Sequence, residues 1–149
     1  MAAVRRGAWV ALRYVTSLYV LGVIVQFFLV GVGLFGMKDG ATIDNADSLN
    51  AHRDLGWALS DFGAGLMLIL ALLAWPKPRK LLGLWILLAV LAFVQPLLAA
   101  GGDDSKYVGM LHPVNALLVL GLSAHLARYA WASRKTEESA AAPAAVPSG

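Results

Sequence analysis

Four long apolar segments constrain the fold of this chain more than any other feature of its sequence. They cover about residues 14–37, 55–75, 81–100 and 107–131. Each is long enough to cross ~30 Å of hydrocarbon as a helix. A soluble domain of 149 residues, of which 59% are hydrophobic and 14% charged, could not bury so much apolar surface. The sequence therefore predicts an integral membrane protein whose fold is an all-α four-helix bundle.

Charged residues in the connections predict the orientation of these helices. Basic residues precede the first segment and fill the turn between the second and third, whereas acidic residues dominate the other two connections. The basic positions are Arg5, Arg6, Arg13, Lys77, Arg79 and Lys80, and the acidic positions are Asp39, Asp44, Asp47, Asp54, Asp103 and Asp104. Because cytoplasmic loops are enriched in Lys and Arg, both termini are expected in the cytoplasm. The expected location is the cytoplasmic membrane of a bacterium.

Composition also excludes several classes of site and partner. The chain has no cysteine, which excludes disulfides, thiolate nucleophiles and cysteine-ligated metals. The net charge of +3 is explained by basic residues at the cytoplasmic helix ends, so no nucleic-acid partner is expected. The expected partners are the lipid bilayer and other membrane-protein subunits or further copies of this chain. Residues 133–149 are polar and then rich in Ala and Pro, which predicts a disordered cytoplasmic tail.

Polar residues within the apolar segments are the candidates for function, because each needs a partner inside the bundle. His52 begins the second segment and His112 begins the fourth, so both are expected to face each other near the outer surface. Gly56 and Ala116 each lie one helical turn after a histidine. Such small side chains leave a slot for another helix or for a planar macrocycle bound to the imidazoles. The alternatives are two interfacial histidines bonded to loop backbone or water, and a different metal.

The two halves of the chain also resemble each other. Gln26 precedes a loop and then His52, and Gln95 precedes a loop and then His112. This order suggests that an ancestral helical hairpin was duplicated.

Short motifs around these residues resemble one four-helix half of the heme A synthase family. His52–Gly56 is similar to the His-Arg-x-x-Gly stretch that opens the second helix of that family. His112–Ala116 is similar to the His-x-x-x-Ala stretch that opens the fourth, and Gln95–Ala99 to the Gln-x-x-Leu-Gly run between them. That family holds a b-type heme between the two histidines, so the resemblance implies heme b with His52 and His112 as axial ligands. The chain is also similar to small four-helix membrane proteins of high-GC bacteria.

This chain departs from the synthases at two points. It supplies one four-helix unit where they have two, and Leu49 stands where they usually carry a glutamate three residues before the first histidine. We therefore expect no independent catalytic activity. The sequence indicates a membrane heme protein that acts in electron transfer, heme handling or a respiratory complex. The alternative is a non-catalytic accessory or scaffold subunit of a larger membrane complex.

Four further residues carry expectations. Arg53 and Lys106 are candidates to hold heme propionates, although for Lys106 an ordinary solvated charge is the preferred interpretation. Asp61 lies about 10 Å inside its helix and is predicted to form a hydrogen bond with Gln95 or Ser60. A polar relay through Asp61, Gln95 and Gln26 is the alternative. His125 is expected to pack or reach toward the membrane surface, away from the histidine pair.

Overall fold

The computed structural model of the chain describes residues 1–43 and 45–141, with side chains through residue 133. All regular structure in these residues is helical. The elements are α1 (Ala2–Phe35), the 3-10 turn η1 (Asp47–Leu49), α2 (Asn50–Trp57), the π-helical turn η2 (Ala58–Gly63), α3 (Ala64–Ala74), α4 (Arg79–Asp104), α5 (Lys106–Gly109) and α6 (Leu111–Ala141). Four helical stretches are long and apolar enough to cross a membrane, as predicted.

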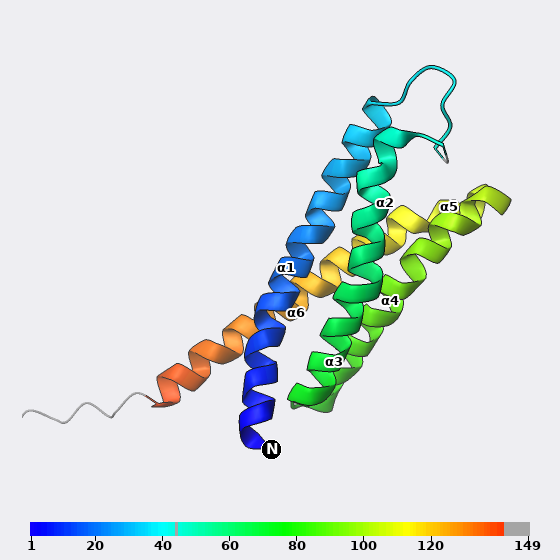
Figure 1. The fold of residues 1–149 in the computed structure, drawn as a ribbon. Helices are drawn as coiled ribbons and strands as arrows, with labels where there is room; N and C mark the ends of the chain where they lie inside the picture. The colour runs from blue at the N-terminus through cyan, green and yellow to red at the C-terminus, as the bar shows by residue number, and fades with distance from the viewer. Residues whose placement is uncertain (44, 142–149) are drawn as a thin grey trace, which may run out of the picture.

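The four long stretches form a closed ring. Helix α1 packs against α3 and α6, and α4 packs against the same two helices from the other side. The loop that follows α1 and the turn between α4 and α5 lie at one end of the bundle, whereas the N-terminus and the turn between α3 and α4 lie at the other (Figure 1). Helix α6 crosses the bundle obliquely. The starts of α2 and α6, which carry the two candidate histidines, therefore lie toward the same end.

The second stretch is one continuous helix built from α2, η2 and α3. It ends at Trp75, whose φ of 49° is left-handed, and Pro76 and Pro78 follow. Proline lacks the amide hydrogen that a helix needs, which explains why the helix ends here, as predicted. Ser60 and Ala64 are buried on the inner face of this helix, one and two turns after Gly56.

The first and last helices extend beyond the segments predicted from hydropathy. Helix α1 begins at Ala2, because residues 2–13 contain no proline and are compatible with helix. Helix α6 continues to Ala141, past the start of the predicted tail, and residues 142–149 lie outside the described residues. The two helices are joined where Trp131 Nε1 donates to Ser17 Oγ at 3.0 Å.

The core toward the end that carries the N-terminus is mostly apolar, but it includes the buried side chain of Arg13. The largest fully buried side chains among the described residues are Trp85, Leu12, Met67, Leu88, Leu126, Thr16 and Ser123. The two hydroxyls bond carbonyls of their own helices, Thr16 at 2.7 Å and Ser123 at 3.1 Å. Hydrogen bonds between the side chains of α4 and α6 occur instead at the opposite end, around His112.

Candidate functional site

His52 and His112 come together between α2 and α6. Their ring centroids are 6.3 Å apart and the rings are inclined at 74°. Both side chains are half-buried. The predicted approach of the two histidines is therefore observed in the structure.

A hydrogen bond to backbone fixes the protonation of one His112 nitrogen. His112 Nδ1 lies 3.1 Å from the backbone oxygen of Gln95. A carbonyl oxygen can only accept a hydrogen bond, so Nδ1 must carry the proton. His112 Nε2 is the nitrogen that remains to be assigned.

The neighbouring amides assign this second nitrogen. Asn115 Nδ2 donates to the backbone oxygen of Leu91 at 2.8 Å and to Gln95 Oε1 at 2.5 Å. This leaves Gln95 Nε2 as a donor, and it lies 3.0 Å from the His112 carbonyl and 3.4 Å from His112 Nε2. Because its neighbour is a donor, His112 Nε2 is assigned as the acceptor in this contact, which agrees with a proton on Nδ1.

His52 repeats the backbone bond in the other half of the chain. Its Nδ1 lies 3.3 Å from the backbone oxygen of Gln26, so this nitrogen also carries a proton. Each histidine thus bonds the carbonyl of a glutamine on the preceding long helix, as the proposed duplication of a hairpin would produce. No hydrogen bond to His52 Nε2 occurs among the described residues.

The space beside His52 is shared by Gly56 and Gln26. A Cβ placed on Gly56 would lie only 2.9 Å from Gln26 Nε2, so a larger residue here would displace the end of this flexible side chain. Gln26 Oε1 is buried and has no hydrogen-bond partner in the described part of the chain. The slot predicted beside Gly56 is thus filled by a flexible side chain with an unsatisfied oxygen. Ala116 is half-buried on α6, one turn after His112.

Arg53 holds the loop that follows α1. Its guanidinium donates to the backbone oxygens of Ala46 and Ile43 and to Asn50 Oδ1. These bonds close the loop over the start of α2. Contact of Arg53 with a heme propionate stays a prediction. Lys106 lies over the ring of Tyr107, 5.3 Å from its centroid.

The predicted bond between Asp61 and Gln95 is wrong. Asp61 is exposed on the outer surface of the bundle, whereas Gln95 bonds His112 and Asn115. Ser60 is buried on the inner face of this helix, and the next residue, Asp61, is turned to the outer face. Within the described residues, no hydrogen bond links Asp61, Gln95 and Gln26 as a relay. His125 is also exposed, on α6.

Asn115 is a further polar residue within the fourth apolar segment, and the structure identifies its partners. It is buried and bonds both the Leu91 carbonyl and the Gln95 side chain. Its position three residues after His112 places it on the same face of α6, which was the available signal.

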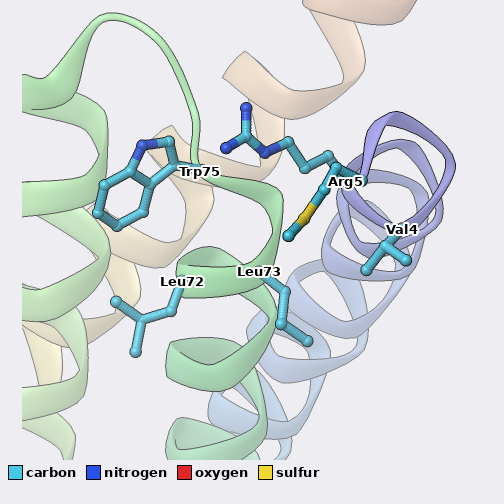
Figure 2. A pocket seen from close by; sticks show the side chains of 6 residues that line it. Val4, Arg5, Leu72, Leu73 and Trp75 are labelled. Carbon is cyan, nitrogen blue, oxygen red and sulfur yellow. The ribbon is translucent and has the colours of Figure 1, made fainter.

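A shallow hollow lies at the opposite end of the bundle, between the start of α1 and the end of α3. Its lining residues are Met1, Val4, Arg5, Leu72, Leu73 and Trp75. In Figure 2 the Arg5 side chain extends from α1 above Leu73. The side chains that line it are the Arg5 guanidinium and apolar groups, and they include no carboxylate, imidazole or hydroxyl. The histidine pair therefore remains the candidate for chemistry.

No protein-family model matches this chain, and no curated protein or solved structure matches it either. In the part of the chain that the structure describes, no three His, Asp or Glu side chains gather as a metal site. A functional interpretation must therefore rest on the two histidines and their partners.

Asn115→Leu tests the amide network. The change removes the donor to Gln95 Oε1, and an unsatisfied buried acceptor is expected to lower the free energy of unfolding by ~1–3 kcal/mol. Ser123→Ala is the matched control, because Ser123 is buried on the same helix but bonds only a carbonyl of that helix. Unfolding in mixed detergent micelles should show the larger loss for Asn115→Leu. Equal losses would contradict a role for Asn115 between helices.

Proposed function

We propose that this protein is a small membrane protein that holds one b-type heme between His52 and His112. The observation that supports the proposal is that each Nδ1 donates to a backbone carbonyl. Histidines that bind a metal usually donate their other ring N–H to a carbonyl or carboxylate, which orients the ring and leaves Nε2 for the metal. Both histidines of this protein are held in that way.

The separation of the rings is compatible with one shared metal atom. Two imidazoles that each bind a metal through Nε2 at about 2.0 Å have ring centroids roughly 6 Å apart. The observed separation is 6.3 Å. A heme would need only two ligands from the protein, and His52 and His112 would supply them. Two histidines are therefore sufficient donors.

Two amides beside the histidines would have to move when heme binds. Gln95 Nε2 would release His112 Nε2, and it would keep its bond to the His112 carbonyl. The Gln26 amide would leave the space beside Gly56, and its buried Oε1 has no hydrogen bond there to lose. If heme is bound here, His52 and His112 would hold its iron, and the group would supply one-electron transfer. We infer electron transfer or heme handling, within or beside a respiratory complex.

We place the heme near the outer face of a bacterial cytoplasmic membrane, with both termini inside. The histidines lie toward the end of the bundle that carries the acidic connections. The opposite end carries the basic turn, where the Arg79 guanidinium lies 4.0 Å from the centroid of the Trp75 ring. Basic residues beside tryptophan are typical of a cytoplasmic membrane interface.

A second candidate function is that of an accessory subunit without chemistry. The observation that favours it is a set of glycines whose Cβ positions have no atom within 4 Å, namely Gly7, Gly31, Gly65, Gly83 and Gly121. Glycines on the outer surface of membrane helices allow close approach of helices from another subunit.

Absorption spectra test the heme proposal. Full-length protein purified from heme-replete cells should show a Soret band and a low-spin b-type spectrum after dithionite reduction. His52→Ala and His112→Ala each remove one axial ligand, so each should abolish the spectrum or convert it to high spin. His125→Ala is the control and should leave the spectrum unchanged, because His125 lies on the outer surface.

Two glycine substitutions test whether heme occupies the space beside His52. Gly56→Leu should reduce heme incorporation, because its side chain would compete with Gln26 and the macrocycle for one space. Gly31→Leu, where the Cβ meets open space, should not. The heme proposal would be overturned by wild-type protein with no Soret band either as purified or after hemin addition. That result would leave the accessory-subunit function standing.

Cysteine labelling tests the orientation, and the chain has no native cysteine to interfere. In intact cells, Ile43→Cys and Asp104→Cys should react with a membrane-impermeant thiol reagent. Lys77→Cys should react only after the cells are opened, because the basic turn is expected inside. Labelling of Lys77→Cys alone in intact cells would mean that the orientation is inverted.

A further inference from the structure

A hollow of about 290 Å³ lies at the basic end of the bundle, between the start of α1 and the end of α3. Its walls include Val4 from α1 and Leu72 and Leu73 from α3. All three side chains are exposed. Leu72 and Leu73 belong to the last turn of a helix of membrane-spanning length. The hollow therefore lies at the level where this apolar helix ends.

Arg5 brings a positive charge to this apolar surface. Figure 2 shows its side chain extending from α1 above Leu73. The guanidinium makes no hydrogen bond or ion pair within the described part of the chain. The acidic residues before residue 134 lie between the end of α1 and the end of η2, or at the end of α4. None of them is at the basic end, so the described side chains supply no counter-ion for Arg5.

Trp75 joins the hollow to a second cation. Its ring lines the hollow, and the Arg79 guanidinium lies 4.0 Å from the centroid of that ring. Trp75 has a φ of 49°, which is in the left-handed region. Glycine usually occupies this position after a helix, and a bulky residue there is strained. Such strained residues cluster at binding sites. Two guanidinium groups thus lie next to one apolar hollow.

We propose that this hollow binds one anionic phospholipid from the leaflet at the basic end of the bundle. The guanidinium groups of Arg5 and Arg79 donate hydrogen bonds to the phosphate, a geometry for which arginine is suited. One acyl chain lies against Val4, Leu72 and Leu73. Basic pockets between membrane helices on the cytoplasmic side bind acidic lipid headgroups. The inference rests on the proposed membrane insertion and is independent of heme.

The chemistry of the hollow favours an anionic lipid over other ligands. A soluble anion would make no use of the apolar walls. A zwitterionic lipid carries a cation in its headgroup, which would lie beside two guanidinium groups. A lipid with a net negative charge satisfies both the cations and the walls. Phosphatidylglycerol has these properties and is the probe for the test.

Native mass spectrometry of the full-length protein released from detergent micelles measures the binding of added lipid. Phosphatidylglycerol should bind more tightly than phosphatidylcholine with the same acyl chains. Arg5→Gln should lower the affinity for phosphatidylglycerol about fivefold, which corresponds to ~1 kcal/mol for a basic residue near an anionic lipid. Its melting temperature without lipid should match that of the wild type, because Arg5 is exposed.

Arg6→Gln is the matched control. It removes the same charge from the next residue of α1, and Arg6 is exposed and does not line the hollow. This variant should keep the wild-type affinity for phosphatidylglycerol. Neither variant should change the affinity for phosphatidylcholine. Equal losses for the two variants would mean that the lipid responds to the overall charge of this end, and the proposal would be wrong.

Two further measurements separate the lipid from other occupants. Glycerophosphoglycerol, the headgroup without acyl chains, should not displace phosphatidylglycerol, because it lacks the chain that contacts the walls. The double variant Glu137→Gln/Glu138→Gln should leave the lipid affinity unchanged. A rise in affinity would show that carboxylates of the chain itself occupy the hollow.

The lipid site would be overturned by displacement with the headgroup alone, by a gain of affinity in the Glu137/Glu138 variant, or by equal affinities for the two lipids. The hollow and the histidine pair lie at opposite ends of the bundle, so Arg5→Gln should leave any heme spectrum unchanged. Failure of the heme proposal would in turn leave the lipid measurements unaffected.

Discussion

The structure of the candidate site depends on one interaction that is made twice, the hydrogen bond from a histidine Nδ1 to the backbone carbonyl of a glutamine on the preceding long helix. A backbone carbonyl is fixed by its helix and can only accept. The bond therefore sets both the orientation and the protonation of each imidazole. It also links α2 to α1 and α6 to α4 at the same end of the bundle. Both rings are thus oriented in the way that is usual for histidines that bind a metal, with Nε2 left for the metal.

The two halves differ in how their side-chain amides are used. In one half, Asn115 bonds Gln95, which in turn reaches the His112 nitrogen that would bind a metal. In the other half, Gln26 Oε1 is buried without a partner in the described residues. A buried polar atom without a hydrogen bond costs free energy, and such atoms are therefore uncommon in folded proteins. A group bound beside His52 would therefore break no hydrogen bond of Gln26 Oε1, whereas a group bound to His112 Nε2 would break its contact with Gln95.

The features that sequence predicted are those that follow from periodicity and composition. Apolar length predicted four helices, and the four-residue spacing of His52 and Gly56 predicted that these two residues lie on one face of the second helix. The pattern did not give the partner of each polar group. Asp61 is one position from the inner face, which is enough to turn it outward, and Arg53 bonds loop carbonyls that no spacing rule connects to it. The hydrogen-bond partner of a polar side chain depends on how the helices pack in three dimensions. The periodicity of a single sequence does not predict that packing.

The central claim is that the proton of each histidine ring lies on Nδ1, so that Nε2 is the nitrogen left to bind a metal. Nitrogen-15 NMR of protein labelled at histidine and prepared without heme measures this directly. The account predicts that His52 and His112 each show one protonated nitrogen, at Nδ1, and one unprotonated nitrogen, at Nε2, and that the Nδ1 proton is protected from exchange. A proton on Nε2 of either residue at neutral pH, in the other tautomer or in an imidazolium, would contradict the account.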